Sequence, residues 1–157
     1  MTVTHPGVRI PPPLIFLVGL LAGFAADHWL LPLPLVSEAR LVWLRVLACG
    51  FAFAAAWLLV AALGGFKRRG TDPRPWREDS ALVVEGIYRH TRNPMYVGMA
   101  LACAAVAVAC NTAWPLLMLA PTLLAIRYYV IAREEAYLLV RFGQGYRDYC
   151  AKVPRWF

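Results

Sequence analysis

The residue types best suited to chemistry occur together in residues 86–98, which read Gly-Ile-Tyr-Arg-His-Thr-Arg-Asn-Pro-Met-Tyr-Val-Gly. Arginines can bind a carboxylate, and tyrosines offer ring faces to a cation or a flat ring. Pro94 can start a helix but cannot extend one backwards, because it lacks an N–H and disfavours helix at the preceding residue. We therefore expect a helix to begin here with Asn93 as its N-cap. A polar cluster in this position is either an interfacial anchor or a site.

A second polar cluster follows the last long apolar run and contains Arg127, Arg133, Glu134 and Glu135. A carboxylate can accept hydrogen bonds from both hydroxyls of a ribose or compensate a cation, and an arginine can hold a carboxylate. Positions 127, 131, 134, 138 and 141 have the spacing of one helical face. The sequence has no P-loop, no glycine-rich dinucleotide motif and no HExxH motif, so helices and the loop between them must hold any cofactor.

Long apolar runs must position both clusters. Of the 157 residues, 61% are hydrophobic and 16% are charged, whereas a soluble domain has about a quarter charged. A helix needs about 20 residues to cross the hydrocarbon layer. The sequence therefore predicts a single-domain, all-α integral membrane protein with about four transmembrane helices, a C-terminal helical hairpin and an amphipathic cytoplasmic tail. The predicted spans cover about residues 14–31, 41–63, 95–110 and 114–132.

Local signals predict where these helices end. Gly64 and Gly65 are expected to end the second span, and Asn111 marks a tight turn that makes spans three and four an antiparallel hairpin. Gly143 is expected to break the amphipathic helix that follows the fourth span. A cleaved signal peptide is the competing interpretation of the first run, although Arg9 alone would supply its basic region. The hairpin places both polar clusters at one membrane face, so we expect a site from residues 80–98 and 127–154.

The net charge of +7 comes from basic residues that flank the apolar runs. This pattern favours lipid headgroups and control of topology over nucleic acid as the partner. Seven of the sixteen basic residues lie between spans two and three, six lie from Arg127 onward, and the turn near Asn111 has none. The positive-inside rule therefore places the site at the cytoplasmic face, and we expect a bacterial inner membrane. The four cysteines have no metal-binding spacing, so no metal site is predicted.

The combined spacing of these motifs resembles the isoprenylcysteine carboxyl methyltransferase family, which is related to the integral-membrane phospholipid methyltransferases. The motifs are Gly86-x-Tyr88-x-x-x-Arg92-Asn93-Pro94-x-Tyr96-x-Gly98, Arg133-Glu134-Glu135, Phe142-Gly143-x-x-Tyr146-x-x-Tyr149 and Val153-Pro154. The resemblance runs from about Ser80 to Pro154. It implies a helical membrane enzyme that binds S-adenosylmethionine without a Rossmann domain and releases S-adenosylhomocysteine.

Carried over by position, the resemblance implies a set of site residues. The implied cofactor-binding residues are Ser80, Ala81, Leu82, Val83, Tyr88, Arg92, Asn93, Pro94, Met95, Tyr96, Glu134 and Glu135. The implied catalytic residues are Arg127 and Glu134. Two positions depart from the family pattern, because Asn93 replaces a histidine of the eukaryotic enzymes and Val130 replaces an arginine one turn before the acidic pair.

The expected function is methyl transfer to a lipid-soluble acceptor, which would be an isoprenoid, a thiol, a carboxylate or a phospholipid amine. Transfer from an activated sulfonium needs mainly proximity, alignment and exclusion of water. One alternative is a non-catalytic membrane assembly or regulatory protein with the same fold. A small transporter or channel is a weaker alternative, because the spans carry almost no embedded charge beyond Arg45 and Arg127. The sequence leaves the oligomeric state and the identity of the acceptor open.

Overall fold

The computed structural model describes residues 6–70 and 82–157, and every regular element within them is helical. The α-helices are α1 (Pro12–Trp29), α2 (Leu41–Arg69), α3 (Pro94–Ala109), α4 (Trp114–Ala125) and α5 (Ala132–Lys152). Two short 3-10 turns are η1 (Glu38–Arg40) and η2 (Gly86–Arg89), and a π-helical turn, η3 (Ile126–Ile131), joins α4 to α5. The predicted all-α class is confirmed.

Within residues 6–70 and 82–157, three helical stretches are long and apolar enough to cross a membrane. They are Pro12–Trp29, Glu38–Arg68 and Trp114–Lys152, and α3 is a shorter apolar helix. The four predicted spans therefore correspond to three long helices and one short one, which agrees with an integral membrane protein.

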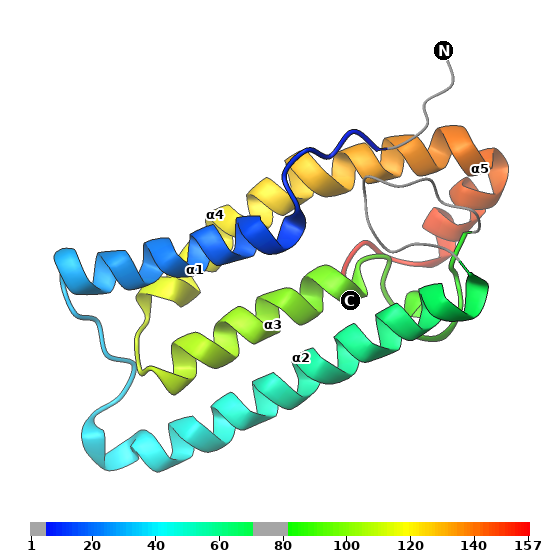
Figure 1. The fold of residues 1–157 in the computed structure, drawn as a ribbon. Coiled ribbons are helices and arrows are strands. Elements are labelled where there is room, and N and C mark those ends of the chain that lie inside the picture. Colours follow the sequence, from blue (N-terminus) through cyan, green and yellow to red (C-terminus); the bar gives the residue numbers. More distant parts are fainter. Residues whose placement is uncertain (1–5, 71–81) are drawn as a thin grey trace.

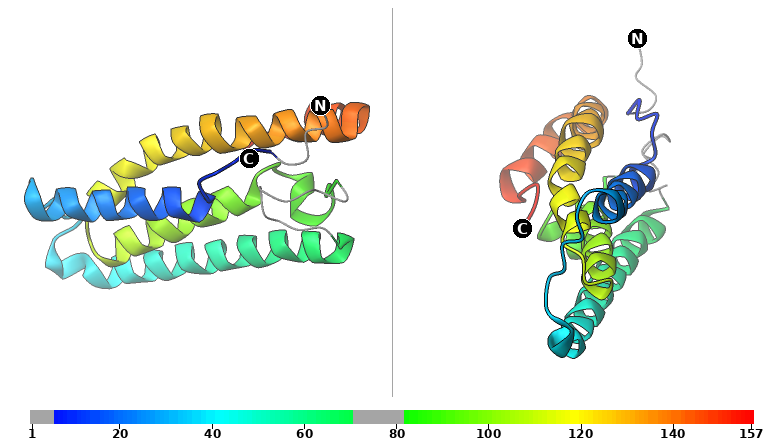
Figure 2. Two further views of the ribbon diagram at one scale, coloured as in Figure 1. Left: turned by 45° about the horizontal axis from the view of Figure 1, so that its top comes forward. Right: turned by 90° about the vertical axis from the view of Figure 1, so that its left-hand side faces the viewer.

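The apolar helices lie side by side as two packed pairs, α1 with α4 and α2 with α3 (Figures 1 and 2). The predicted hairpin of α3 and α4 is present, but each of its arms packs mainly against one of the first two helices. The first two helices thus flank the hairpin and hold its arms in position.

Small residues let α2 and α3 approach each other closely. A Cβ at Gly98 of α3 would lie 2.9 Å from Leu59 Cγ and 3.3 Å from the carbonyl oxygen of Ala55, both on α2. Ala55 and Ala62 are buried on the facing side of α2, as its run of small residues indicates. Close approach of this kind is how helices associate where the hydrophobic effect between them is absent.

Helix α2 does not end at Gly64 and Gly65, and that prediction is wrong. The helix continues to Arg69 and ends at Gly70, which has the left-handed φ of 63° typical of a C-terminal cap. Gly65 is buried, and a Cβ there would lie 3.2 Å from Val83 and 3.4 Å from Tyr88. Its lack of a side chain therefore makes room for the chain before α3, and this packing outweighs the helical cost of about 1 kcal/mol per glycine.

The π-helical turn η3 interrupts the regular helix between α4 and α5. Ile126, Val130 and Ile131 are buried there, whereas Arg127 is exposed. The single face predicted for positions 127, 131, 134, 138 and 141 is therefore broken at this turn, because the extra residue changes the helical repeat. Gly143 has φ 51° and ψ −120° inside α5, so the predicted break at this residue is confirmed.

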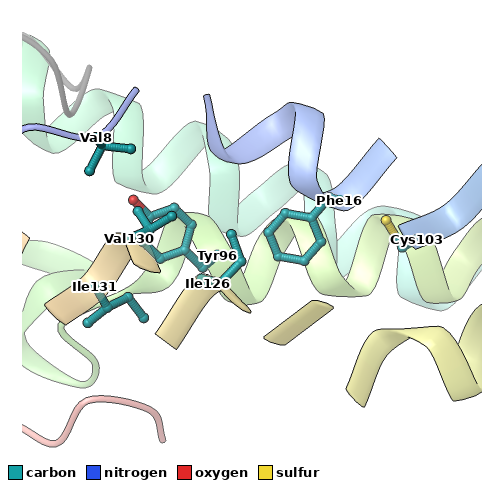
Figure 3. Packing of buried hydrophobic residues seen from close by; sticks show 7 residues of the cluster. All are labelled: Val8, Phe16, Tyr96, Cys103, Ile126, Val130 and Ile131. Carbon is teal, nitrogen blue, oxygen red and sulfur yellow. The ribbon is translucent and has the colours of Figure 1, made fainter. Parts of the chain in front are cut away.

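A buried apolar cluster packs the N-terminal segment onto this turn (Figure 3). Its members come from the N-terminal segment, α1, α3 and η3, and are Val8, Phe16, Tyr96, Cys103, Ile126, Val130 and Ile131. The N–H groups of Arg9 and Ile10 donate to the hydroxyl of Tyr129 at 3.2 and 3.3 Å. The first residues of the described chain are therefore held beside η3.

A polar network closes the opposite end of the bundle. Asn111 has φ 53° in the turn between α3 and α4. Its Oδ1 accepts from the N–H groups of Leu35 and Val36 at 3.1 and 3.0 Å, and its Nδ2 donates to the carbonyl of Val36. Asp27 accepts from the Thr112 hydroxyl at 2.6 Å. This turn is thus tied to both neighbouring segments, as expected for a fixed hairpin.

Candidate functional site

The hairpin brings the segment before α3 and the acidic pair of α5 into direct contact. The hydroxyl of Tyr96 donates to Glu134 Oε1 at 2.5 Å. Arg92 Nη1 lies 3.0 Å from Glu135 Oε1 and forms an ion pair with it. The two polar clusters therefore meet as the sequence predicts, although which of these residues binds a ligand stays a prediction.

Asn93 occupies the N-cap position of α3, but its side chain does not cap the helix. The helix begins at Pro94 as predicted, and the carbonyl of Asn93 accepts from the N–H of Tyr96 at 3.1 Å. The Asn93 side chain instead donates from Nδ2 to the carbonyl of Arg155 at 2.9 Å. Asn93 is therefore the N-cap residue by position, as predicted, but its side chain caps no backbone N–H and instead binds the end of the chain.

The C-terminal segment, residues 153–157, supplies a second guanidinium to the acidic pair. Arg155 Nε donates to Glu135 Oε1 at 2.9 Å, and Arg155 Nη2 donates to Oε2 at 2.6 Å. These two bonds form the paired arrangement that arginine favours with a carboxylate. The hydrogen bonds raise the pKa of Arg155 above its usual value, so this group stays charged. Glu135 thus lies between two cations, Arg92 and Arg155.

The backbone of the C-terminal segment also binds the segment before α3. The carbonyl of Pro154 accepts from the N–H of Arg92 at 3.0 Å. The carbonyl of Arg155 accepts from the hydroxyl of Thr91 at 3.2 Å and from Asn93. Thr91 is fully buried, and its hydroxyl oxygen accepts from the N–H of Asn93. Residues 91–93 are therefore fixed by the tail of the chain.

The other predicted cofactor residues pack against the end of α2. Tyr88 is buried, and its ring meets that of Phe66 edge-on, with centroids 5.7 Å apart. Its carbonyl accepts from the Tyr149 hydroxyl at 2.7 Å. Val83 belongs to the same buried cluster, and Leu82 is half-buried beside it in the chain.

Two further predicted residues, Ser80 and Ala81, lie outside the described residues. Pro94 is fully buried, and Met95 packs against the Tyr88 cluster.

Arg127 lies on the outer surface of η3. Its side chain is exposed, and its guanidinium lies 5.4 Å from the centroid of the Tyr128 ring. Arg133 lies 4.3 Å from the Tyr129 ring and donates to the carbonyl of Tyr129 at 2.6 Å. The guanidinium groups beside the acidic pair come instead from Arg92 and Arg155. The catalytic role of Arg127 stays a prediction.

Arg92 has an unused donor at the centre of this cluster. Its Nη1 also donates to Cys150 Sγ at 2.8 Å, whereas its Nε is buried and has no hydrogen-bond partner among the described residues. A buried donor without an acceptor costs about 1–3 kcal/mol. A ligand with acceptor oxygens would remove this cost, and a carboxylate such as Glu134 has the chemistry to accept from ligand hydroxyls or to compensate a cation. The donors and acceptors present therefore fit a zwitterionic ligand; within the described ranges no His, Cys, Asp and Glu cluster could hold a metal ion.

Sequence reasoning missed the contribution of Thr91, Cys150 and Arg155. Helix α5 ends at Lys152, and the residues after it form a short tail. No sequence signal indicates which surface a five-residue tail will pack against. The contacts between residues 91–93 and 154–155 link positions more than 60 apart, and only the folded chain brings them together.

The chain is similar in sequence to known methyltransferases. A family model described as "Phospholipid methyltransferase" matches residues 43–145. The protein-S-isoprenylcysteine O-methyltransferase of Schizosaccharomyces pombe is 34% identical over 77 residues, which are 49% of this chain and 33% of that protein. The match thus spans about a third of the length of that curated relative. No solved structure matches the chain.

Proposed function

The chain belongs to the phospholipid methyltransferase family, because the family model matches more than half of its residues, and from this premise we propose that it is a membrane methyltransferase that uses S-adenosylmethionine. The methyl acceptor is a lipid-soluble molecule that carries a thiol, a carboxylate or an amine. The name of the Schizosaccharomyces pombe relative supports an isoprenoid-bearing acceptor, and the family description supports a phospholipid.

The observation that carries this proposal is the contact between the start of α3 and the acidic pair of α5. This contact consists of two residue pairs that are distant in the sequence. Tyr96 and Glu134 are 38 positions apart, and Arg92 and Glu135 are 43 positions apart. They gather two carboxylates, a half-buried cation and a tyrosine at the end of an apolar helix bundle. A charged cofactor from water and an apolar acceptor from the bilayer can meet in such a place.

The residues of this cluster have the chemistry to hold the cofactor. S-adenosylmethionine supplies an activated methyl group on a sulfonium. Arg92, through its unpartnered Nε, is the group to bind the carboxylate of the cofactor, and Glu134 is the group to accept hydrogen bonds from ribose hydroxyls. Tyr96 orients Glu134 by donating to Oε1. Leu82, Val83, Tyr88 and Met95 supply apolar and aromatic surface.

The acceptor decides whether a proton must be removed. A thiolate or a carboxylate attacks the methyl group without a base, whereas an ammonium must first lose a proton. Glu134 is the candidate general base of this cluster, but its Oε1 already accepts a hydrogen bond from Tyr96. We therefore favour an acceptor that needs no base. The basic segments support a site at the cytoplasmic face, and a bacterial inner membrane is the proposed location.

Binding of S-adenosylhomocysteine to purified protein in detergent tests the proposal by calorimetry. The wild type is expected to bind, and Glu134→Ala or Asn93→Ala is expected to remove binding while the protein stays folded. Asp148→Ala is the matched control, because it removes an exposed carboxylate of the same helix. Absence of binding by the wild type at millimolar ligand would instead favour a non-catalytic assembly or regulatory protein. Unchanged affinity in both site variants would overturn the assignment of residues.

Identification of the acceptor needs a second experiment. The purified protein is incubated with isotope-labelled S-adenosylmethionine and total membrane lipid, and the products are analysed by mass spectrometry. A label on an isoprenoid, a thiol or carboxylate lipid, or a phospholipid headgroup would name the acceptor class. Glu134→Ala protein is the control for transfer that does not depend on the site.

A further inference from the structure

We propose that Arg155 is a positioning residue of this site, which fixes Glu135 and residues 91–93 so that Arg92 and Glu134 can bind the methyl donor. This inference rests on the proposed function. The C-terminal segment returns to the start of α3 after the kink in α5 (Figure 1). It lies beyond residues 43–145, which the family model matches.

Arg155 contacts both halves of the site with different parts of the residue. Its side chain forms two bonds to Glu135 on α5, at 2.9 and 2.6 Å. Its carbonyl accepts from Thr91 and Asn93, in the segment before α3. One residue thus links the two elements that the proposed site requires to be adjacent.

The hydrogen bonds of Arg155 also give the two glutamates of the acidic pair different surroundings. Glu135 accepts from Arg92 Nη1 and from two nitrogens of Arg155, so three of its approximately four acceptor positions are occupied. A carboxylate held in this way orients the Arg92 guanidinium, whose buried Nε is a donor without a hydrogen-bond partner among the described residues. Glu135 therefore supports Arg92, and the proposed function assigns ligand binding to Glu134.

The C-terminal segment is itself held in place on both sides of Arg155. Val153 is buried, and Trp156 packs against the apolar cluster that contains Tyr96. Pro154 accepts a bond from the N–H of Arg92 through its carbonyl. Loss of the Arg155 side chain is therefore expected to release Glu135 and Arg92 while the segment stays attached.

Thiol labelling of ligand-free protein tests, without any cofactor, whether the Arg155 side chain holds Glu135 and Arg92 in place. Cys150 Sγ lies 2.8 Å from Arg92 Nη1 and is half-buried. Its rate of reaction with a water-soluble maleimide, followed by peptide mass spectrometry, reports whether Arg92 is held. We expect R155Q to raise this rate about tenfold, because a released Arg92 leaves the half-buried sulfur open to the reagent. R155K should raise it less because it keeps the charge, and R147Q, which removes an exposed cation of the same helix, should leave it unchanged. An unchanged rate in R155Q would overturn the proposal.

Affinity for S-adenosylhomocysteine tests the consequence for the site. R155Q is expected to weaken binding about tenfold, R155K to restore part of it, and R147Q to match the wild type. In the E135Q background, R155Q should change the affinity by less than about twofold, because both residues act through one contact. Additive losses, or a lower melting temperature with unchanged affinity, would show a merely structural role. Failure of the wild type to bind would refute the proposed function instead, and the labelling rates would still decide the role of Arg155.

Discussion

Tyr96 connects the apolar and the polar parts of the site within one side chain. Its ring belongs to the buried cluster that contains Val8 and Val130, and its hydroxyl donates to Glu134. The ring is therefore held by packing while the hydroxyl orients a carboxylate. The sequence motif contains this tyrosine, but an interfacial aromatic belt would also contain one. The bond to Glu134 supports the site role over the anchor role.

Tyr96→Phe is expected to weaken binding of S-adenosylhomocysteine about tenfold and to lower the melting temperature by only a few degrees. The ring stays packed, whereas Glu134 loses a hydrogen bond of the charged kind, which is worth about 1.5–3 kcal/mol. Calorimetry and a thermal melt in detergent measure the two effects. Tyr128→Phe is the matched control, since Tyr128 is 66% exposed. A larger effect in the control than at position 96 would contradict the role of this hydroxyl.

At the scale of the elements, two close contacts between helices decide where the site residues lie. Helix α3 is seated against α2 at Gly98, and α1 is seated against α4 at Gly23, which lies against the backbone of Pro115. A backbone neighbour cannot move aside as a flexible side chain can. A side chain at Gly23 would therefore push α1 and α4 apart. Because α4 continues through η3 into α5, the position of α4 also sets the position of the acidic pair.

Gly23→Ala is expected to destabilise the protein by about 1–3 kcal/mol, because the added methyl group overlaps the backbone of Pro115. Gly50→Ala is the control. A Cβ at Gly50 of α2 meets nothing within 4 Å, so this change should stabilise the helix by about 0.5–1 kcal/mol. Melting temperatures of the two variants in the same detergent should thus move in opposite directions. Equal shifts would refute close packing of α1 on α4.

At the scale of the whole molecule, the polar groups lie at two ends of an apolar bundle. The site and the C-terminal segment occupy one end, and the turn held by Asn111 and Asp27 occupies the other. Basic residues are concentrated at the site end, and residues 110–113 have none. This asymmetry sets the expected orientation in the membrane.

Cysteine labelling of intact bacterial cells that express the protein is expected to confirm a cytoplasmic site. Cys110 is exposed at the end of α3 opposite the site, whereas Cys150 lies beside Arg92. A membrane-impermeant maleimide should label Cys110 in intact cells and reach Cys150 only after permeabilisation. Peptide mass spectrometry separates the two sites. Labelling of Cys150 but not Cys110 in intact cells would reverse the proposed orientation.

Several features of this protein were predictable from the sequence because their causes are local. A chain this apolar needs helices to satisfy its backbone in lipid, Pro94 must open a helix because it has no N–H, and Gly143 breaks α5. The short turn at Asn111 makes α3 and α4 antiparallel, so the two polar clusters must meet at one end. The residues of the Asn-Pro segment and the acidic pair could therefore be predicted as neighbours.

Only the tertiary structure decided which of these groups touch and what supports them. Glycines at 64 and 65 read as a helix end, but packing of Val83 and Tyr88 on Gly65 keeps α2 helical to Arg69. The π turn exposes Arg127, and Arg155 takes a place beside Glu135. Such outcomes depend on which distant surfaces fit together. Local preferences of about 1 kcal/mol yield to packing and buried hydrogen bonds that form only when the whole chain is folded.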